Sequence, residues 1–313
     1  MVPDDRLHLL ALCALPGVSW YAVARAAQEP EGLTRLLRGE QTEKSTEGAD
    51  TARAIREGLG ELDRHVVRAR DEVNAAEEAV GAKLVTVLDD EYPANLRLIF
   101  NLPPFLFYRG ELQRDDVRSV AVVGTRGASD EGLGRARRMA AALVGDGVTV
   151  LSGLAAGIDS AAHEATLEAD GRTIAVMGTG ILRAYPASNK ELAERIAETG
   201  ALVSQFWPTQ PPARHTFPRR NVVTSGMSQG TVVIEASETS GAKMQARLAL
   251  QHGKMAFLVE SLVTSQKWAS DYLRKYPRAV EIHDVQEVID RLRSTEIVES
   301  ATEGRRQLAL GLP

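Results

Sequence analysis

The sequence predicts an α/β protein with a Rossmann-like, mostly parallel sheet and flanking helices, preceded by a small all-helical domain. Two observations carry this prediction. From residue 117 onward, short β-branched runs such as VRSVAVVG and VTVLSG alternate with helical stretches of ten or more residues, which is the pattern of strands joined by crossover helices. The strand runs are almost continuously apolar, as expected of parallel strands that are buried on both faces.

Residues 1–80 are predicted to form the helical domain. The run DRLHLLALCAL has apolar residues at helical spacing, Pro16 and Gly17 then indicate a turn, and the helical pattern resumes in YAVARAAQEPEGLTRLL. Residues 40–80 are polar with weak periodicity, so we expect one or two exposed helices there that do not build a core. The single cysteine, Cys13, lies in the apolar run and is expected to be a small core residue.

Residues 81–295 are predicted to form the sheet domain. The segment 83–112 starts with a β-type run and carries an aromatic cluster, Phe105, Phe107 and Tyr108, which we expect to pack against the next part of the chain. A sheet of about six strands comes next, and the segment 278–294 predicts one further strand and helix. Residues 296–313 are charged and predicted to be disordered. The six strand runs are VRSVAVVG, VTVLSG, TIAVMGTG, ALVSQF, GTVVIEA and KMAFLV.

The charge of the chain is unevenly distributed. The formal net charge is −5, but residues 1–116 hold 14 Lys and Arg against 21 Asp and Glu, a balance of −7, which leaves +2 for residues 117–313. An acidic total can therefore coexist with a positive groove in the sheet domain. No stretch approaches the roughly 18 apolar residues of a membrane span, and the N-terminus lacks a basic region before its apolar run. We expect a cytoplasmic protein with no membrane partner.

Four of the predicted strands end in turns rich in glycine and hydroxyl side chains. In open α/β sheets, ligands bind at the carboxyl ends of the strands, where glycine lets the backbone approach an anion and Ser or Thr adds a donor. Such turns also use Gly and Ser for geometry or helix capping alone, and none of these is a GxGxxG or Walker A sequence. The candidate phosphate-binding residues are Gly124, Thr125 and Arg126; Ser152, Gly153 and Gly157; Gly178, Thr179 and Gly180; and Glu235, Ser240, Gly241 and Lys243.

A basic segment, HTFPRRN, follows the fourth strand run. We expect it to be a loop at the same edge of the sheet as the glycine turns, with Arg219 and Arg220 neutralising phosphates and Asn221 beside them. Phe217 either stacks on a base or fills the core.

No catalytic arrangement and no metal or cofactor site is predicted. His163 falls in the middle of a helix and is expected to be structural, and His215 has no partner that the sequence shows. The six histidines are scattered, without an HxxxH motif or a cysteine cluster. Glu235 ends an apolar strand, where it could orient a ribose hydroxyl, cap the next helix or act as a base.

In order and spacing, these motifs resemble the DNA-processing protein A family, also called Smf. The resemblance runs from about residue 84 to 260 and is carried by GTRGASDEGLG, LSGLAAGIDSAAH, VMGTGILRAYPASN, FPRRN and VVIEASETSGAKMQAR. The N-terminal LLALCALPGVSWYAVARAAQEPEGLTRLL is similar to the small helical domain of that family, of the sterile-alpha-motif or helix-hairpin-helix type.

The resemblance implies a homodimeric protein without catalytic activity that binds single-stranded DNA in a positively charged pocket. It further implies that the protein protects incoming DNA from nucleases and helps to load the RecA recombinase during natural transformation. The contacts that the resemblance places on this sequence are Arg126, Ser152, Gly153, Phe217, Arg219, Arg220, Asn221 and Lys243.

The chain departs from the family pattern at three positions. Many members have basic residues where this chain has Ala156, Ala187 and Val222, and each change removes a potential phosphate contact. We also do not expect the winged-helix domain that often ends family members.

Two alternatives remain open at this point. One is a nucleoside-monophosphate phosphoribohydrolase-like enzyme of the same superfamily, with Glu235 and Arg126 as catalytic candidates, although IEASETSGA replaces its PGGxGTxxE signature. The other is a sensor that binds a nucleotide signal or foreign DNA without RecA.

Overall fold

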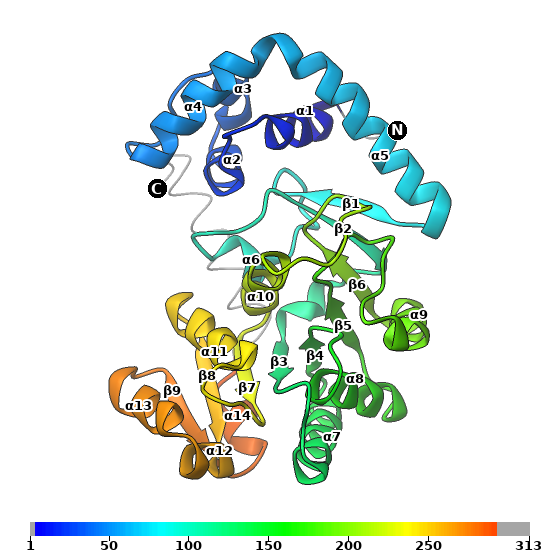
Figure 1. The fold of residues 1–313 in the computed structure, drawn as a ribbon, viewed down its shortest axis with the longest axis vertical. Helices are drawn as coiled ribbons and strands as arrows, with labels where there is room; N and C mark the ends of the chain where they lie inside the picture. Colours follow the sequence, from blue (N-terminus) through cyan, green and yellow to red (C-terminus); the bar gives the residue numbers. More distant parts are fainter. Residues whose placement is uncertain (1–3, 293–313) are drawn as a thin grey trace.

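The computed structural model describes residues 4–292, and it confirms the predicted fold class (Figure 1). Five helices come first and a mixed sheet with flanking helices follows. The helices of the first part are α1 (Asp4–Ala14), α2 (Trp20–Ala27), α3 (Gly32–Leu37), α4 (Thr46–Gly58) and α5 (Leu62–Val80), with the short 3-10 helix η1 (Leu59–Glu61) between the last two.

The described part of the second region contains a nine-stranded sheet. Its elements are β1 (Lys83–Thr86), α6 (Ala94–Arg97), β2 (Phe105–Gly110), β3 (Ser119–Val123), α7 (Asp130–Gly145), β4 (Thr149–Ser152), α8 (Ile158–Glu168), β5 (Thr173–Val176), α9 (Lys190–Thr199), β6 (Ala201–Ser204), α10 (Thr216–Met227), β7 (Gly230–Val233), α11 (Gly241–Gln251), β8 (Met255–Val259), α12 (Glu260–Ser265), α13 (Lys267–Lys275), β9 (Ala279–Ile282) and α14 (Gln286–Ile289). Two short 3-10 helices, η2 (Arg114–Val117) and η3 (Ala187–Asn189), complete the set.

The order of the strands across the sheet is β1-β2-β6-β5-β4-β3-β7-β8-β9. All neighbours from β6 to β9 are parallel, whereas β1 pairs antiparallel with β2 and β2 with β6. The aromatic segment thus adds an antiparallel hairpin to one edge, and β9 extends the other. Phe105 and Phe107 of β2 are buried, which explains why this segment joins the sheet.

Two groups of helices cover the sheet. The helices α7, α8 and α9 pack on one another in sequence and contact strands β3 to β6, while α10 and α11 pack together and contact β3, β5, β7 and β8. The chain moves outward from β3 to β6 and then reverses to β7. Because parallel crossovers are right-handed, this reversal puts the two groups on opposite faces.

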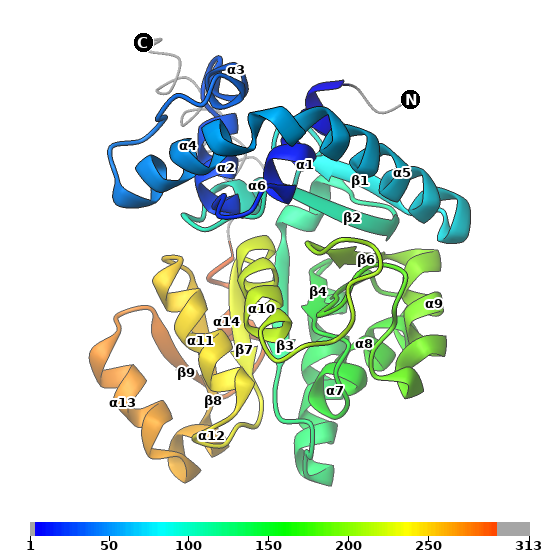
Figure 2. The same cartoon turned by 45° about the horizontal axis from the view of Figure 1, so that its top comes forward.

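The N-terminal helices lie over the edge of the sheet that carries β1 and β2 (Figures 1 and 2). The expectation that residues 40–80 add no core is wrong for one side of α4, where Ala52 and Ile55 are buried, and for one side of α5. Ala69, Val73 and Ala76 lie one helical turn apart, are buried, and belong to the helix that packs on α1. Small apolar side chains in a mostly polar helix give weak periodicity, so the buried stripe was missed. Cys13 is buried in α1, as predicted.

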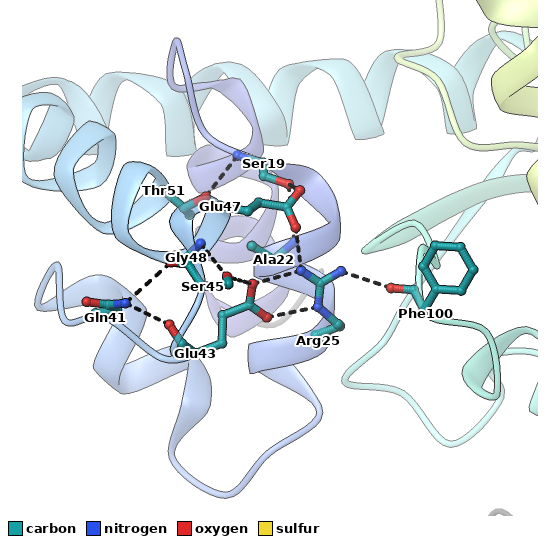
Figure 3. Close-up of polar contacts among 10 residues, drawn as sticks. All are labelled: Ser19, Ala22, Arg25, Gln41, Glu43, Ser45, Glu47, Gly48, Thr51 and Phe100. Atoms are coloured by element: carbon teal, nitrogen blue, oxygen red, sulfur yellow. Dashed lines mark hydrogen bonds and ion pairs between the residues drawn. The ribbon is translucent and has the colours of Figure 1, made fainter.

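Polar contacts also join the helical part to the sheet part. Arg25 of α2 makes ion pairs with Glu43 and Glu47, at 2.9 and 2.6 Å, and its Nη1 donates to the carbonyl oxygen of Phe100 at 2.9 Å (Figure 3). Trp20 packs against Phe105 of β2 in a tilted arrangement, with ring centroids 5.0 Å apart. The buried apolar cluster runs through both parts. The division at residue 80 into two domains stays a prediction, and the predicted tail, 296–313, lies outside the described residues.

The segment expected to be a loop after the fourth strand run is instead the start of α10. Thr216, Phe217 and Pro218 are its first three residues. The first amide groups of a helix have no intrahelical acceptor, so a proline in the first turn loses no hydrogen bond. The rest of α10 is nearly all buried, and at its end the buried amine of Lys254 donates to the carbonyl oxygens of Gly226 and Ser228.

Candidate functional site

A pocket opens where the direction of the chain across the sheet reverses. The chain leaves β3 toward β4 and later returns to β7 on the other side of β3, so the turns at the carboxyl ends of these strands diverge. We call this pocket, of about 310 Å³, the switch-point pocket. It is lined by Val123, Gly124, Thr125, Arg126, Gly153, Ala155, Asp159, Phe217, Arg220, Asn221, Thr224, Ser237, Ser240, Gly241, Ala242, Met244 and Gln245.

Three of the four predicted glycine turns meet at this pocket. Gly124, Thr125 and Arg126 come from the turn after β3, Gly153 from the turn after β4, and Ser240 and Gly241 from the turn after β7. Ser240 accepts a hydrogen bond from the backbone amide of Ala242 at 3.1 Å and so caps α11.

The turn after β5 lies beside the pocket and supports it. A Cβ atom on Gly178 would meet the ring of Phe217 at 2.7 Å, so this glycine lets the ring pack closely on the turn. The hydroxyl of Thr179 donates to the carbonyl oxygen of Arg183, and the backbone amide of Gly180 donates to the carbonyl oxygen of Gln210 at 2.9 Å. None of the three lines the pocket.

Ser152 and Gly157 shape the turn after β4 without lining the pocket. Ser152 is buried, and its hydroxyl donates to the carbonyl oxygen of Val122 at 2.7 Å. Gly157 has φ +80°, and a Cβ there would stand 2.5 Å from the carbonyl oxygen of Thr125. Only glycine fits both the backbone conformation and the close approach.

Arg126 is the exposed cation of the pocket. Its guanidinium lies 5.1 Å from the centroid of the Phe217 ring. Within residues 4–292 it makes no hydrogen bond and no ion pair, so its donors are available to an anionic ligand. The ring holds the cation beside the pocket through a cation–π interaction.

Arg220 is buried, in contrast, and most of its donors are used by the protein. Its Nη1 donates to the carbonyl oxygens of Val176, at 3.0 Å, and Gly153, and its Nε donates to the Oδ1 atom of Asn221 at 2.9 Å. Nη2 has no hydrogen-bond partner within the described chain. Arg220 therefore joins α10 to the ends of β4 and β5 and keeps one nitrogen for a ligand.

Arg219 and Lys243 are directed elsewhere, and neither lines the pocket. The Arg219 guanidinium lies over two rings, 4.9 Å from the centroid of Trp20 and 5.6 Å from that of Phe206. Lys243 forms an ion pair with Glu238. The roles predicted for them as phosphate contacts stay predictions, but in this structure their charges have protein partners.

The carboxylate of Glu235 is hydrogen-bonded to the N-cap residue of α7. Its carboxylate accepts hydrogen bonds from the hydroxyl of Ser129 at 2.7 Å and from the amide of Ser129 at 3.2 Å. Ser129 is the N-cap of α7, where an acidic side chain also interacts favourably with the helix dipole. This geometry differs from the predicted capping of the next helix, since α11 is capped by Ser240 and Glu235 instead holds Ser129, the N-cap of α7. The roles of Glu235 toward a ribose or as a base stay predictions.

Electrostatically, the pocket combines two cations with one buried carboxyl group and several helix N-termini. Burial raises the pKa of Asp159, while the charge of Arg220 opposes that shift. Burial lowers the pKa of Arg220, while Asp159 opposes it. The first turns of α8, α10 and α11 all contribute lining residues, and helix N-termini favour anions. The site is thus suited to a phosphate group.

Sequence reasoning missed several residues near the site. Asp159, Met244 and Gln245 line the pocket, and their positions in the first turns of helices that follow glycine turns were the available signal. Arg214, which does not line the pocket, is exposed two residues before α10 and has no hydrogen bond or ion pair within residues 4–292. Tyr185 is exposed beside Phe217.

The three positions at which relatives often carry basic residues have different surroundings here. Ala156 and Ala187 are exposed, so a basic side chain at either would reach solvent. Val222 is buried in α10 and packs in the apolar core.

His163 is fully buried, and its Nδ1 lies 2.7 Å from the Oγ1 atom of Thr173, which agrees with the structural role expected of it. In the described part of the chain, no group of three or more His, Cys, Asp or Glu side chains is arranged to hold a metal ion. No helix between residues 4 and 292 is both long and apolar enough to cross a membrane.

Comparison with known sequences identifies related proteins. The family model described as DNA recombination-mediator protein A matches residues 83–293. Protein Smf from Synechocystis is 33% identical over 267 residues, which cover 82% of this chain and 65% of that protein. DNA processing protein DprA from Streptococcus pneumoniae is 35% identical over 189 residues, which cover 60% of this chain and 67% of that protein. The chain thus spans about two thirds of the length of these relatives.

Solved structures show the same likeness. The crystal structure of DNA processing protein A from Streptococcus pneumoniae superposes with a TM-score of 0.74 at 25% identity, covering 93% of this chain and 99% of the other. A structure of DNA processing protein A from Helicobacter pylori, whose description concerns its single-stranded DNA binding mode, has a TM-score of 0.60 at 24% identity and covers 68% of this chain and 96% of the other.

Proposed function

The chain belongs to the DNA recombination-mediator protein A family, and on this premise we propose that it binds single-stranded DNA at the switch-point pocket. The relative from Helicobacter pylori is described as binding single-stranded DNA, which supports the proposal. The observation that carries it is the pairing of Arg126 and Phe217 at one pocket, 5.1 Å apart. A single strand offers both a phosphate for the cation and an unstacked base for a ring.

The pocket fits a nucleic-acid backbone for a further reason. The turns at the ends of β3, β4 and β7 and the first turns of three helices surround it, and such N-termini present backbone amides and a favourable dipole to phosphates. Arg220 also lines the pocket, and its Nη2 has no hydrogen-bond partner in the described chain. Sequence-independent contacts of this kind suit a binder that accepts many sequences.

We further propose that the protein acts without catalysis. The alternative of a phosphoribohydrolase-like enzyme needs Glu235 as a base, but its carboxylate bonds to Ser129 at the start of α7 and is absent from the pocket lining. Release of free base from nucleoside monophosphates, abolished by Glu235→Gln, would overturn this part of the proposal.

The cellular role that we propose is protection of incoming single-stranded DNA and loading of RecA recombinase during natural transformation, by a cytoplasmic homodimer. Membership of a family described as DNA recombination-mediator protein A supports this role. Co-precipitation of RecA with the tagged chain, in the presence and absence of single-stranded DNA, tests the partner. A chain that binds DNA but never retains RecA would instead favour the sensor alternative.

Binding itself is tested with labelled single-stranded and double-stranded oligonucleotides at two salt concentrations. We expect preference for the single strand and affinity that falls with salt. Arg126→Ala should weaken binding about tenfold or more, because it removes a charge-assisted contact, and should reduce the salt slope by about 0.7.

Arg53→Ala is the matched control, since it removes an exposed arginine of α4 that is paired with Asp50. Equal losses in the two variants would place binding elsewhere on the surface. No binding of any single strand at low salt would exclude the proposed function.

A further inference from the structure

A second aromatic ring stands next to the switch-point pocket. Tyr185 lies in the link between β5 and α9, and its ring centroid is 5.8 Å from that of Phe217. It is 43% exposed and is one of four large apolar or aromatic side chains exposed in the described chain. Of those four, it is the one that contacts a residue of the pocket.

The backbone on both sides of Tyr185 is held in place. Before it, the amide of Leu182 donates to the carbonyl oxygen of Pro208 at 3.1 Å. After it, the side-chain amide of Asn189 donates to the carbonyl oxygen of Leu154 at 3.0 Å and to the hydroxyl of Ser160 at 2.8 Å. The link is thus tied to the turn after β4, and the exposed ring is presented from an anchored segment. An anchored ring loses less conformational entropy when it binds a ligand.

The surroundings of Phe217 leave Tyr185 as the more accessible ring. Phe217 is half-buried, with the Arg126 guanidinium 5.1 Å from its centroid and Gly178 packed against it from the turn after β5. Tyr185 contacts Phe217 as well and is the more exposed of the two rings. Within residues 4–292 the Tyr185 hydroxyl has no hydrogen-bond partner. No polar contact of the described fold therefore explains the exposed position of this ring.

The cations of the pocket also point to a contribution from stacking. Of the four cationic side chains predicted at the site, Arg219 and Lys243 interact with protein groups away from the pocket, and Arg220 is buried. Arg126 remains as the exposed one. Single-strand binders combine phosphate contacts with stacking of bases on aromatic rings, and each stacked base adds about 1–3 kcal/mol to the binding free energy.

We propose that Tyr185 is a base-stacking residue of the single-stranded DNA site, with Phe217 as the residue that positions both Tyr185 and Arg126. This inference rests on the proposed function. A strand with its phosphate at Arg126 would place a neighbouring base against the outer ring. The contact is independent of sequence, because every base has a π face.

Tyr185→Ala in the full chain should weaken binding of a single-stranded oligonucleotide about tenfold, whereas Tyr185→Phe, which keeps the ring, should bind as the wild type does. The salt slope should be unchanged in both variants, because no phosphate contact is lost. Phe100→Ala removes another exposed ring, near the N-terminal helices, and should leave affinity unchanged.

An oligonucleotide with abasic sites separates stacking from a general structural effect. Wild type should bind it more weakly than the intact strand, while Tyr185→Ala should bind the two strands equally. If the wild type binds single-stranded DNA but Tyr185→Ala keeps full affinity, the stacking role is wrong and the proposed function stands. If the wild type binds no single strand, the proposed function itself fails. Circular dichroism and thermal melting verify that each variant is folded.

Discussion

Arg219 and Arg220 are neighbours in the sequence, yet they serve different parts of the molecule. Successive side chains on a helix point about 100° apart, so α10 sends Arg220 toward the ends of β4 and β5 and Arg219 toward Trp20 and Phe206. A variant that removes both arginines therefore changes the core and the junction with the N-terminal helices as well as the site. Arg126 is the cleaner probe of binding.

The burial of Arg220 leads to a prediction about stability. Arg220→Ala removes donors from the carbonyl oxygens of Gly153 and Val176 and leaves the buried carboxyl of Asp159 without its nearby cation. We expect the free energy of unfolding to fall by about 2–4 kcal/mol, measured by urea denaturation. Arg126→Ala, at an exposed position, should change it by less than about 0.5 kcal/mol. Similar midpoints for both variants would contradict the structural role of Arg220.

At the scale of elements, the switch-point pocket depends on how turns and helix starts fit together. Gly157 lets the turn after β4 approach the turn after β3, Glu235 and Ser129 hold the start of α7, and Pro218 is accommodated in the first turn of α10. The strands were predictable because buried parallel strands are apolar throughout. The start of α10 was not, because a proline beside two arginines is equally typical of a loop.

Replacement of Gly157 tests the fit between the turns. Gly157→Ala combines φ +80° with a Cβ only 2.5 Å from a backbone oxygen of Thr125, so we expect it to cost about 2 kcal/mol or more of stability. It should also weaken DNA binding, since it displaces the turn that carries Arg126.

Gly145→Ala at the end of α7 is the control. A Cβ there would meet nothing within 4 Å, and alanine is the better helix former, so unfolding should be unchanged or harder by up to about 1 kcal/mol. Thermal melts of both variants, with DNA titrations of those that fold, make the comparison. Equal stability of the two would show that the backbone at residue 157 relaxes freely.

At the scale of the whole molecule, one apolar cluster extends from the N-terminal helices through the sheet. The contacts of Arg219 with Trp20 link this shared core to α10, and hence to the pocket. Two histidines of the sheet part are shielded from solvent, His163 completely and His252 in part. Burial lowers the pKa of His163 to about 3 and that of His252 to about 4, and the charge of Lys254 adds to the effect on His252.

These two histidines predict how stability depends on pH. Both have folded pKa values below the ordinary 6.5, so between pH 6.5 and about 4 the unfolded chain binds more protons than the folded chain. The contribution of these histidines to stability is therefore fully present above pH 6.5 and is lost as the pH falls toward their folded pKa values, by up to about 1.4 kcal/mol per pH unit for each histidine. Urea denaturation at pH 7 and pH 5 measures the loss. His252→Gln should reduce by about one the number of protons that the chain takes up on unfolding in this pH range, and so should make the free energy of unfolding less dependent on pH. Equal stability of the wild type at both pH values would refute the prediction.

The sequence by itself determined the α/β class, the parallel strands and the four glycine turns, three of which meet at the pocket, because apolar runs and glycine requirements are local properties of the chain. Only the tertiary structure decided which polar side chains face that pocket. Arg126 does, whereas Arg219 and Lys243 interact with rings or carboxylates elsewhere and Glu235 accepts hydrogen bonds from Ser129, the N-cap of α7. The direction of a side chain depends on the register of its helix and on the order of strands across the sheet, and neither is contained in a local motif.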